Sequence, residues 1–429
     1  MKKMNSFLLL ISMIFYMSAC KKNDGNTPGI ADAYNNTMVL KWNDAAAIAV
    51  SHMAGIPPMT ESRVYAMVNV AMHDALNNIA KKYHTYALTG ATVQDASPDA
   101  AVAQAAHDVL VNLAPAQQAF ADSILNISLG PIATGSLKDK GIELGKAAAA
   151  AMIAKRITDG ASTAQYAIVQ GTMPGQYQST PPFAATGFAS FPGWGKVVPF
   201  SLSTPSQFRP AAPYAINSPQ YAKDLNEIKT MGVATGSTRT QDQTQLGVFW
   251  LENIPSSWSR IARILIDQKN LNGWNTARLL AILNMAEADA NIAAFDGKYF
   301  YNFWRPITAV RLADQDGNDQ TTGDGGWNLL GNVTPPVPDY PSNHAADGGA
   351  AAELLKLYFG TDNFSFALHS NTMPGTTRNF TSLSQAATEV SLSRIYVGYH
   401  FRNAVVAGED LGRKIGRWVL ENSLLAVRE

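Results

Sequence analysis

Cysteine is almost absent from this chain of 429 residues: the only one is Cys20. The rest of the chain therefore has neither a disulfide nor a thiolate ligand for a metal ion. Acidic and basic residues number 33 each, so no net charge favours binding to nucleic acid. Clustered carboxylates and long uncharged apolar runs are also missing after the first segment. These absences disfavour a nucleic-acid-binding protein, a zinc or magnesium hydrolase and an integral membrane protein.

Residues 1–20, "MKKMNSFLLLISMIFYMSAC", have the pattern of an export signal. Two lysines precede a short apolar run, and small residues lead to Cys20, as in a bacterial lipoprotein signal. A cleaved secretory signal with a leftover thiol is the alternative. We expect lipidation at Cys20, a polar tether over residues 21–38, and a location in the cell envelope, periplasmic or on the outer-membrane surface. The lipid would be the only membrane contact.

Helical periodicity dominates the remaining chain, and no clear alternating strand is evident. Arg63 and Asp74 are eleven residues apart in one amphipathic segment, and Arg278 and Asp289 repeat that spacing in a later one. The motif "GIELGK" at 141 is echoed by "GEDLGR" at 408. The same order of paired segments predicts an all-α protein of two related helical bundles. Chance similarity of alanine-rich helices is the alternative.

The two copies cover roughly residues 60–160 and 275–423. We place an N-terminal helical bundle with its connector at 39–240, and a C-terminal bundle at 241–429. The connector is rich in proline, glycine, serine and aromatic residues, which is typical of a loop that runs over the surface.

Three short segments of the second copy contain the residues suited to chemistry. Lys298 and Arg305 lie seven positions apart, so one continuous helix would place both on the same side. "PSNH" opens a helix with the hydroxyl of Ser342, and "SRIYVGYH" places Arg394 six residues before His400. Three cations and a helix N-terminus suit a tetrahedral oxyanion. Singly, each residue has an ordinary alternative as a solvated charge or a core side chain.

The pattern K-x6-R-P, then P-S-x-H, then S-R-x5-H resembles the signature shared by vanadium-dependent haloperoxidases and the type 2 phosphatidic acid phosphatase superfamily. Further segments, among them "MHDALNNI" and "FPGWGKVVPFSL", look like soluble bacterial members of the haloperoxidase branch. Larger members of that branch are α-helical and contain two related bundles.

This resemblance implies an oxyanion pocket for vanadate, or for phosphate as the analogous group. Lys298, Arg305 and Arg394 would hold the equatorial oxygens. Ser342 would hydrogen-bond one oxygen, and Asn343 would donate its backbone N–H.

The resemblance also assigns the histidines: His400 as the axial ligand of vanadium, or the nucleophile toward phosphorus, and His344 as the acid–base. The implied reaction is oxidation of halide by hydrogen peroxide, with small molecules as partners; the oligomeric state stays unassigned. A phosphatase acting through a phosphohistidine is the alternative, and a non-catalytic oxyanion-binding protein of the envelope is a third possibility.

Two positions depart from the family pattern. Asn343 replaces the usual glycine, and Ala404 replaces an aspartate that often orients the last histidine, so we expect Asn403 or a backbone carbonyl to hold that ring. Val337 occupies a place where halide-selective relatives carry an aromatic residue or histidine, so the halide stays unassigned.

Five further residues outside the signature have titratable or charged side chains. His73 and Asp74 are expected to be structural, and Asp289 is a candidate partner for an arginine of the site. His369 and Arg378 could approach a substrate, although nothing in the sequence fixes their position.

Overall fold

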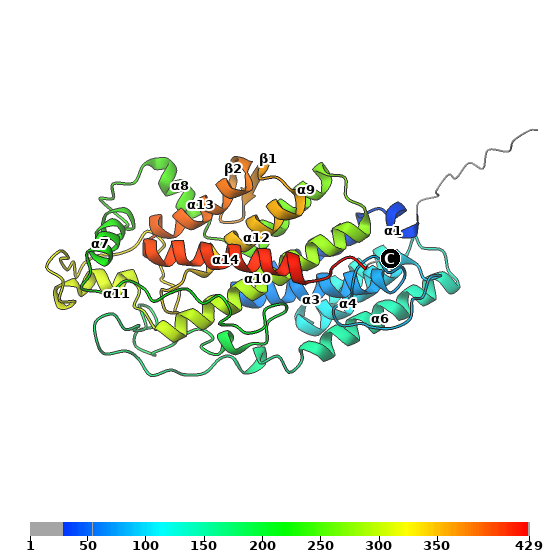
Figure 1. Ribbon diagram of the computed structural model, residues 1–429, viewed down its shortest axis with the longest axis horizontal. Helices are drawn as coiled ribbons and strands as arrows, with labels where there is room; N and C mark the ends of the chain where they lie inside the picture. The colour runs from blue at the N-terminus through cyan, green and yellow to red at the C-terminus, as the bar shows by residue number, and fades with distance from the viewer. Residues whose placement is uncertain (1–28, 54, 428–429) are drawn as a thin grey trace, which may run out of the picture.

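Two sets of five helices form the body of the protein in the computed structural model, which describes residues 29–53 and 55–427 (Figure 1). The first bundle contains α2 (Thr37–Ser51), α3 (Pro58–Asn77), α4 (Pro98–Leu113), α5 (Gln118–Leu129) and α6 (Ser136–Arg156). The second contains α9 (Ile254–Gln268), α10 (Gly273–Tyr301), α12 (Asn343–Phe359), α13 (Leu383–Tyr396) and α14 (Arg402–Asn422). The all-α prediction is confirmed. The predicted signal and Cys20 lie outside the described residues.

The last helix of each bundle packs closely on the middle helix through glycine. A Cβ placed at Gly145 would lie 2.6 Å from the carbonyl oxygen of Ala101, and one at Gly412 would lie 2.0 Å from that of Ala346. Only glycine permits this approach between helices. These glycines belong to "GIELGK" and "GEDLGR", so the repeated motif marks the same helix contact in both bundles.

A buried aspartate repeats in the same way on the two long helices α3 and α10, which pack against each other. Asp74 accepts hydrogen bonds of 2.6–2.9 Å from the backbone N–H groups of residues 86–88. Asp289 accepts bonds of 2.6–2.9 Å from those of residues 200–202. Asp289 therefore anchors the connector, and the interpretation as a partner for a site arginine is wrong. His73 contacts Asp74 at 3.1 Å and is fully buried, in line with a structural role.

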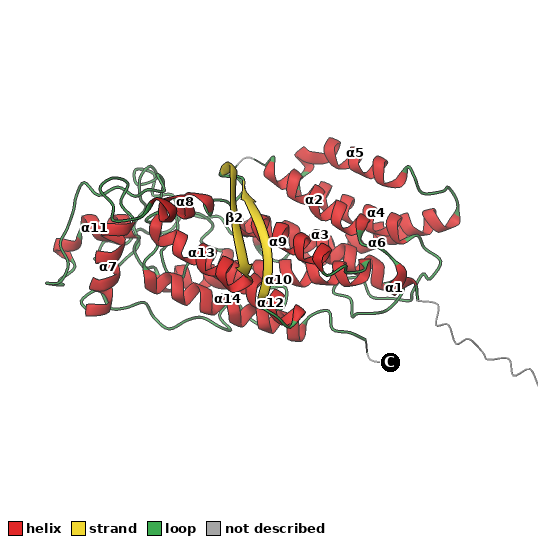
Figure 2. Cartoon of the chain, turned by 90° about the horizontal axis from the view of Figure 1, so that it is seen from above, coloured by secondary structure: helices red, strands yellow, loops and turns green. Residues whose placement is uncertain are grey.

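The remaining elements extend or cover the bundles (Figure 2). They are α1 (Ile30–Ala33), α7 (Pro219–Met231), α8 (Gln241–Phe249), α11 (Pro306–Arg311), and the short 3-10 helices η1 (Pro115–Gln117), η2 (Ala161–Thr163), η3 (Trp194–Lys196) and η4 (Ala313–Gln315). An antiparallel hairpin, β1 (Asn363–Ser370) with β2 (Met373–Ser382), crosses the second bundle. The expectation of no strands is wrong here. Strand β1 alternates buried and exposed side chains, so "NFSFALHS" contained the signal.

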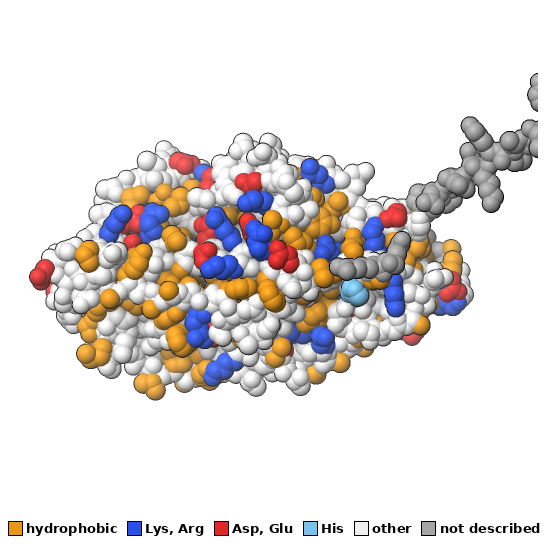
Figure 3. Space-filling model, viewed as in Figure 1, with side chains coloured by type: hydrophobic (Ala, Val, Ile, Leu, Met, Phe, Trp, Pro, Cys, Tyr) orange, Lys and Arg blue, Asp and Glu red, His pale blue; other side chains and the backbone are white. Residues whose placement is uncertain are grey.

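Side chains of different kinds cover different parts of the surface. In Figure 3, charged side chains gather over α14, while hydrophobic side chains lie along the lower part of the face, where the connector runs in Figure 1. Exposed hydrophobic side chains of the connector include Tyr166, Val169, Met173 and Phe188. Among the described helices, none combines the length and hydropathy needed to cross a bilayer.

Candidate active site

The three signature segments meet around a cavity of about 260 Å³. Its walls include five of the predicted site residues: Arg305, Asn343, His344, Arg394 and His400. The other two predicted site residues, Lys298 and Ser342, are fully buried and do not line the cavity.

Lys298 and Arg305 reach this region from different elements. Helix α10 ends at Tyr301, and Asn302 then adopts a left-handed conformation that stops the helix. Arg305 is the N-cap of the next helix, α11. The expectation that one helix carries both cations is therefore wrong. The chain turns after α10, and Arg305 reaches the same site from the start of α11.

Backbone carbonyls hold the three cations in place. Lys298 Nζ donates to the carbonyl oxygens of residues 338 and 339 at 2.9 and 3.0 Å. Arg305 donates to those of residues 337 and 399 at 2.6 and 2.8 Å, and Arg394 donates to that of residue 250 at 2.5 Å. Each cation keeps N–H donors beyond these contacts, because an ammonium has three and a guanidinium five. The Nη2 of Arg305 is buried and has no partner among the described residues.

Burial makes these positive charges costly without an anion. It lowers the pKa of Lys298 well below its ordinary value, and the nearby Arg305 lowers it further. Burial also lowers the pKa of Arg394 to about 10. The nearby carboxyl group is Asp339, whose Oδ1 lies 4.0 Å from Arg305 Nη1. Three cations against one carboxyl leave an excess of buried positive charge, and a bound oxyanion would offset it.

The segment "PSNH" forms the start of α12. Ser342 is the N-cap, and its hydroxyl accepts a hydrogen bond from the N–H of Ala345 at 3.4 Å. Asn343 is the first helical residue and is not among the residues with positive φ. Its backbone conformation is therefore open to residues other than glycine, and its N–H belongs to the unpaired first turn that attracts anions.

His400 is oriented by a residue that the sequence reasoning missed. Its Nδ1 lies 2.8 Å from Oδ1 of Asp339, which precedes His344 by five positions. Asn403 Oδ1 contacts only the backbone N–H of Tyr214, at 3.4 Å, so the expectation that Asn403 or a carbonyl holds the ring is wrong. The sequence did contain a signal for this role, because Asp339 is an acidic residue only three positions before Ser342 in "PDYPSNH".

The contact with Asp339 determines which nitrogen of His400 faces the cations. When the carboxylate accepts from Nδ1–H, Nε2 keeps its lone pair, and Nε2 lies 3.3 Å from Arg305 Nη1. Burial, Arg305 and Lys298 all lower the pKa of His400 well below its ordinary value. The ring is therefore neutral near pH 7 and can act as a ligand or a nucleophile. Burial raises the pKa of Asp339 to about 7, against the opposing effect of Arg305 and Lys298.

His344 has the environment of a neutral base. Burial lowers its pKa well below the ordinary value, and Arg394 lowers it further, whereas a hydrogen bond with the backbone of Glu252 opposes this shift. Its Nε2 is buried without a partner in the described part of the chain. His344 can therefore take up or release a proton at the cavity.

The turn between α8 and α9 is a second element that the sequence reasoning missed. The carbonyl of Trp250 accepts from Arg394, the backbone of Glu252 supports His344, and Leu251 and Asn253 line the cavity. Because "FWLENIP" contains no charged cluster or motif, its sequence gave no sign of this role.

Two further candidates lie away from the site. His369 and Arg378 are on the hairpin, where Arg378 pairs with Glu389 and Asp242 at 2.8 Å. Neither residue lines the cavity, so the idea that they approach a substrate there is wrong. Val337 does line it, as expected from its place before His344.

Comparisons with known proteins point to one family. The model of the VCPO second helical-bundle domain matches residues 278–428. The vanadium chloroperoxidase of Curvularia inaequalis is 23% identical over an alignment of 500 positions, gaps included, which covers 89% of this chain and 81% of that protein.

Solved structures agree with the sequence comparisons. A bacterial vanadium-dependent iodoperoxidase superposes with a TM-score of 0.76 at 25% identity, covering 92% of this chain and 97% of the other. Along most of its length this chain is therefore similar to vanadium haloperoxidases, and residues 278–428 match the model of their second helical-bundle domain. A holo-type bacterial vanadium-dependent chloroperoxidase, 19% identical, shares the fold of the family with a TM-score of 0.72, covering 90% of this chain and 97% of its own.

Proposed function

We propose that the protein is a vanadium-dependent haloperoxidase that oxidises halide with hydrogen peroxide. The observation that carries this proposal is the cavity itself: two buried arginines and two histidines line it, a buried lysine lies near Arg305, and a single carboxyl group is nearby. That arrangement suits a tetrahedral oxyanion bound through a histidine nitrogen. The relatives named above are haloperoxidases, which favours vanadate over phosphate and gives the phosphatase alternative no separate support.

The residues present fit vanadate. Lys298, Arg305 and Arg394 would hold its oxygens through N–H groups that the protein leaves free, above all the unpartnered Nη2 of Arg305. Asn343 would donate its backbone N–H from the first turn of α12, and Ser342 its hydroxyl. His400 would supply Nε2 to the vanadium. When bound, vanadate activates hydrogen peroxide toward halide without a change in its oxidation state.

The protein's own part in the reaction is positioning and proton transfer. Halide, hydrogen peroxide and one proton yield hypohalous acid and water, so each turnover consumes a proton. His344 is placed to deliver this proton, because its unpartnered Nε2 belongs to a ring on the cavity wall. Asp339 keeps His400 in the required tautomer and orientation.

We also propose that the protein is anchored in the cell envelope by a lipid. Lipidation at Cys20 and an envelope location rest on the sequence pattern of residues 1–20 alone. Labelling with a radioactive fatty acid in the native host, compared with a Cys20→Ser variant, tests this part. A label that persists in the variant would contradict it.

The activity is tested with orthovanadate, peroxide and either bromide or iodide, beside hydrolysis of p-nitrophenyl phosphate without vanadate. We expect halide oxidation that depends on vanadate and is lost in His400→Ala. Phosphate ester hydrolysis that vanadate inhibits, with no halide oxidation, would replace this proposal by the phosphatase. A non-catalytic binding protein would show neither activity.

A further inference from the structure

A second and larger cavity lies in the first bundle, beside the active site. Its volume is about 520 Å³, in the usual range for sites that bind small molecules. The lining is mostly apolar and comes from the start of α3, the ends of α4 and α6, and the connector. Pro57 lines both this cavity and the active-site cavity, so the two are neighbours at the turn that precedes α3.

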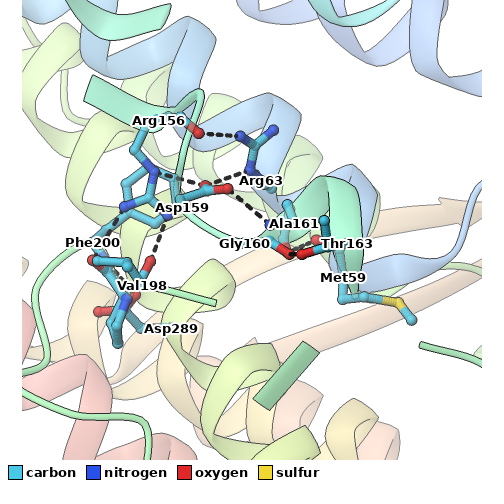
Figure 4. Close-up of polar contacts among 12 residues, drawn as sticks. Met59, Arg63, Arg156, Asp159, Gly160, Ala161, Thr163, Val198, Phe200 and Asp289 are labelled. Carbon is cyan, nitrogen blue, oxygen red and sulfur yellow. Dashed lines mark hydrogen bonds and ion pairs between the residues drawn. The ribbon is translucent and has the colours of Figure 1, made fainter. Parts of the chain in front are cut away.

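Polar donors without partners mark one side of this second cavity. Arg63 Nε donates to Asp159 at 2.8 Å, and Arg63 Nη2 donates to the carbonyl of Arg156 at 3.0 Å. Figure 4 shows the second terminal nitrogen of Arg63 free of such contacts. Trp194 also lines the cavity, and its Nε1–H is buried without a partner among the described residues. Arg63 is 14% exposed and can be reached from the cavity, whereas the indole N–H is inaccessible, so it is the guanidinium that points to a ligand with an oxygen acceptor.

The free N–H groups of Arg63 favour an anionic ligand. Asp159 accepts hydrogen bonds from both Arg63 and Arg156, and Asp289 lies near Arg156 as a second acidic residue. Arg156 is otherwise occupied by the carbonyls of residues 198 and 199. Both arginines line the cavity, and Arg63, whose side chain is 14% exposed against 2% for Arg156, is the more accessible of the two.

Two aromatic residues, Phe191 and Trp194, form part of the apolar wall, and the backbone of Phe191 has an unusual conformation. Phe191 lies edge-on to Trp194, with ring centroids 5.8 Å apart. The backbone φ of Phe191 is +45°, which is rare for a bulky residue and is found mostly where the surrounding structure enforces it. Such a wall suits a flat ring, because aromatic groups pack well edge to face or offset.

We propose that this cavity binds an aromatic molecule with an anionic oxygen group, such as an aryl carboxylate. Its ring would pack on Phe191 and Trp194, and its carboxylate would accept from the free N–H groups of Arg63. The next step of this inference rests on the proposed function: the bound ring is the acceptor of the halogen. Hypohalous acid exchanges a ring C–H bond for a carbon–halogen bond, and the proton and hydroxide leave together as water.

Binding is measured first, with 6-hydroxy-2-naphthoate as the probe and the purified protein without vanadate or halide. Ile153→Trp on α6 fills the cavity and should weaken binding at least ~10-fold, which corresponds to ~1.4 kcal/mol. The matched control is Leu137→Trp, on the same helix but 60% exposed and outside the cavity, which should bind as the unmodified protein does. No measurable binding, or equal binding by both variants, overturns the proposal.

The anionic group is tested separately with Arg63→Gln and with the uncharged 2-naphthol. We expect this variant to bind the naphthoate roughly 10-fold more weakly, with a much smaller change for 2-naphthol, because only the carboxylate needs the guanidinium. Equal losses for both probes would contradict the assigned role of Arg63. Should Arg63→Gln fold poorly, the comparison of the two probes on the unmodified protein decides: tighter binding of 2-naphthol overturns the anionic class.

The acceptor role is tested by kinetics. Ile153→Trp should raise KM for bromination of 6-hydroxy-2-naphthoate and leave iodide oxidation unchanged. An unchanged KM overturns the acceptor role, although the binding result stands. If the protein oxidises no halide, the proposed function fails together with the acceptor role, and the binding experiment still decides whether the cavity is a site.

Discussion

The role of Asp339 can be isolated by comparing two substitutions at the same position. Asp339→Asn and Asp339→Ala both remove the carboxylate, so both change the field around Lys298 and Arg305 in the same way. They differ at His400: the asparagine amide oxygen can still accept from Nδ1–H at the 2.8 Å position, whereas alanine leaves that N–H without a protein acceptor. The difference between the two variants therefore measures the hydrogen bond and not the charge.

Its size follows from the geometry. Partners that orient a metal-ligating histidine typically change metal affinity 10- to 100-fold when removed. We therefore expect Asp339→Ala to bind vanadate ~10- to 100-fold more weakly than Asp339→Asn, a difference of about 1.4–2.7 kcal/mol. Asp339 and His400 are both buried, so solvent offers little compensation for the lost hydrogen bond.

Vanadate affinity would be measured by isothermal titration calorimetry and by the vanadate dependence of iodide oxidation. Near-UV circular dichroism would establish that both variants are folded, which is expected because Lys298 bonds to the backbone of residue 339 and not to its side chain. Asn403→Ala serves as a further control and should bind vanadate normally. Equal affinities of the asparagine and alanine variants, or a large loss in Asn403→Ala, would refute the reasoning.

Four other perturbations have expected outcomes. His344→Ala should lower kcat for halide oxidation ~10²- to 10⁴-fold and leave vanadate affinity within about threefold; a normal kcat would exclude the acid–base role. Asn343→Gly should retain vanadate affinity in the same titration, since φ at this position is not positive, and a large change would show that the side chain takes part. Gly412→Ala should lower the free energy of unfolding in urea by ~1–3 kcal/mol or more, because its Cβ would meet a carbonyl of α12, whereas Gly325→Ala, with open space around it, should change little. Glu287 is buried, neither of its carboxyl oxygens has a partner among the described residues, and burial together with neighbouring acids raises its pKa. The protonated carboxyl therefore favours the folded state fully below about pH 4.5, and this contribution to stability declines as pH rises. Glu287→Gln should gain thermal stability relative to the unmodified protein between pH 5 and 8, and a difference that does not vary with pH would contradict this.

Much of the fold is encoded in local patterns of the sequence. Helical periodicity and repeated spacings, such as that of Asp74 and Asp289, predicted two related bundles, because a helix brings together residues that are close in sequence. Strand β1 was missed although its alternation is present, since eight residues among long helices give a weak signal. The turn after α10 was also missed, because the left-handed conformation of Asn302 depends on its surroundings.

The sequence by itself identified the candidate residues for binding an oxyanion. Lys298, Arg305 and His344 stand in short motifs whose spacing is readable without coordinates. Only the tertiary structure decided what supports them: Asp339 and His400 are 61 positions apart and meet only because α12 and the start of α14 pack together. The second cavity is likewise formed by segments far apart in the chain. Motifs record local chemistry, whereas contacts between distant segments depend on how the whole chain packs, and no single stretch of sequence encodes them.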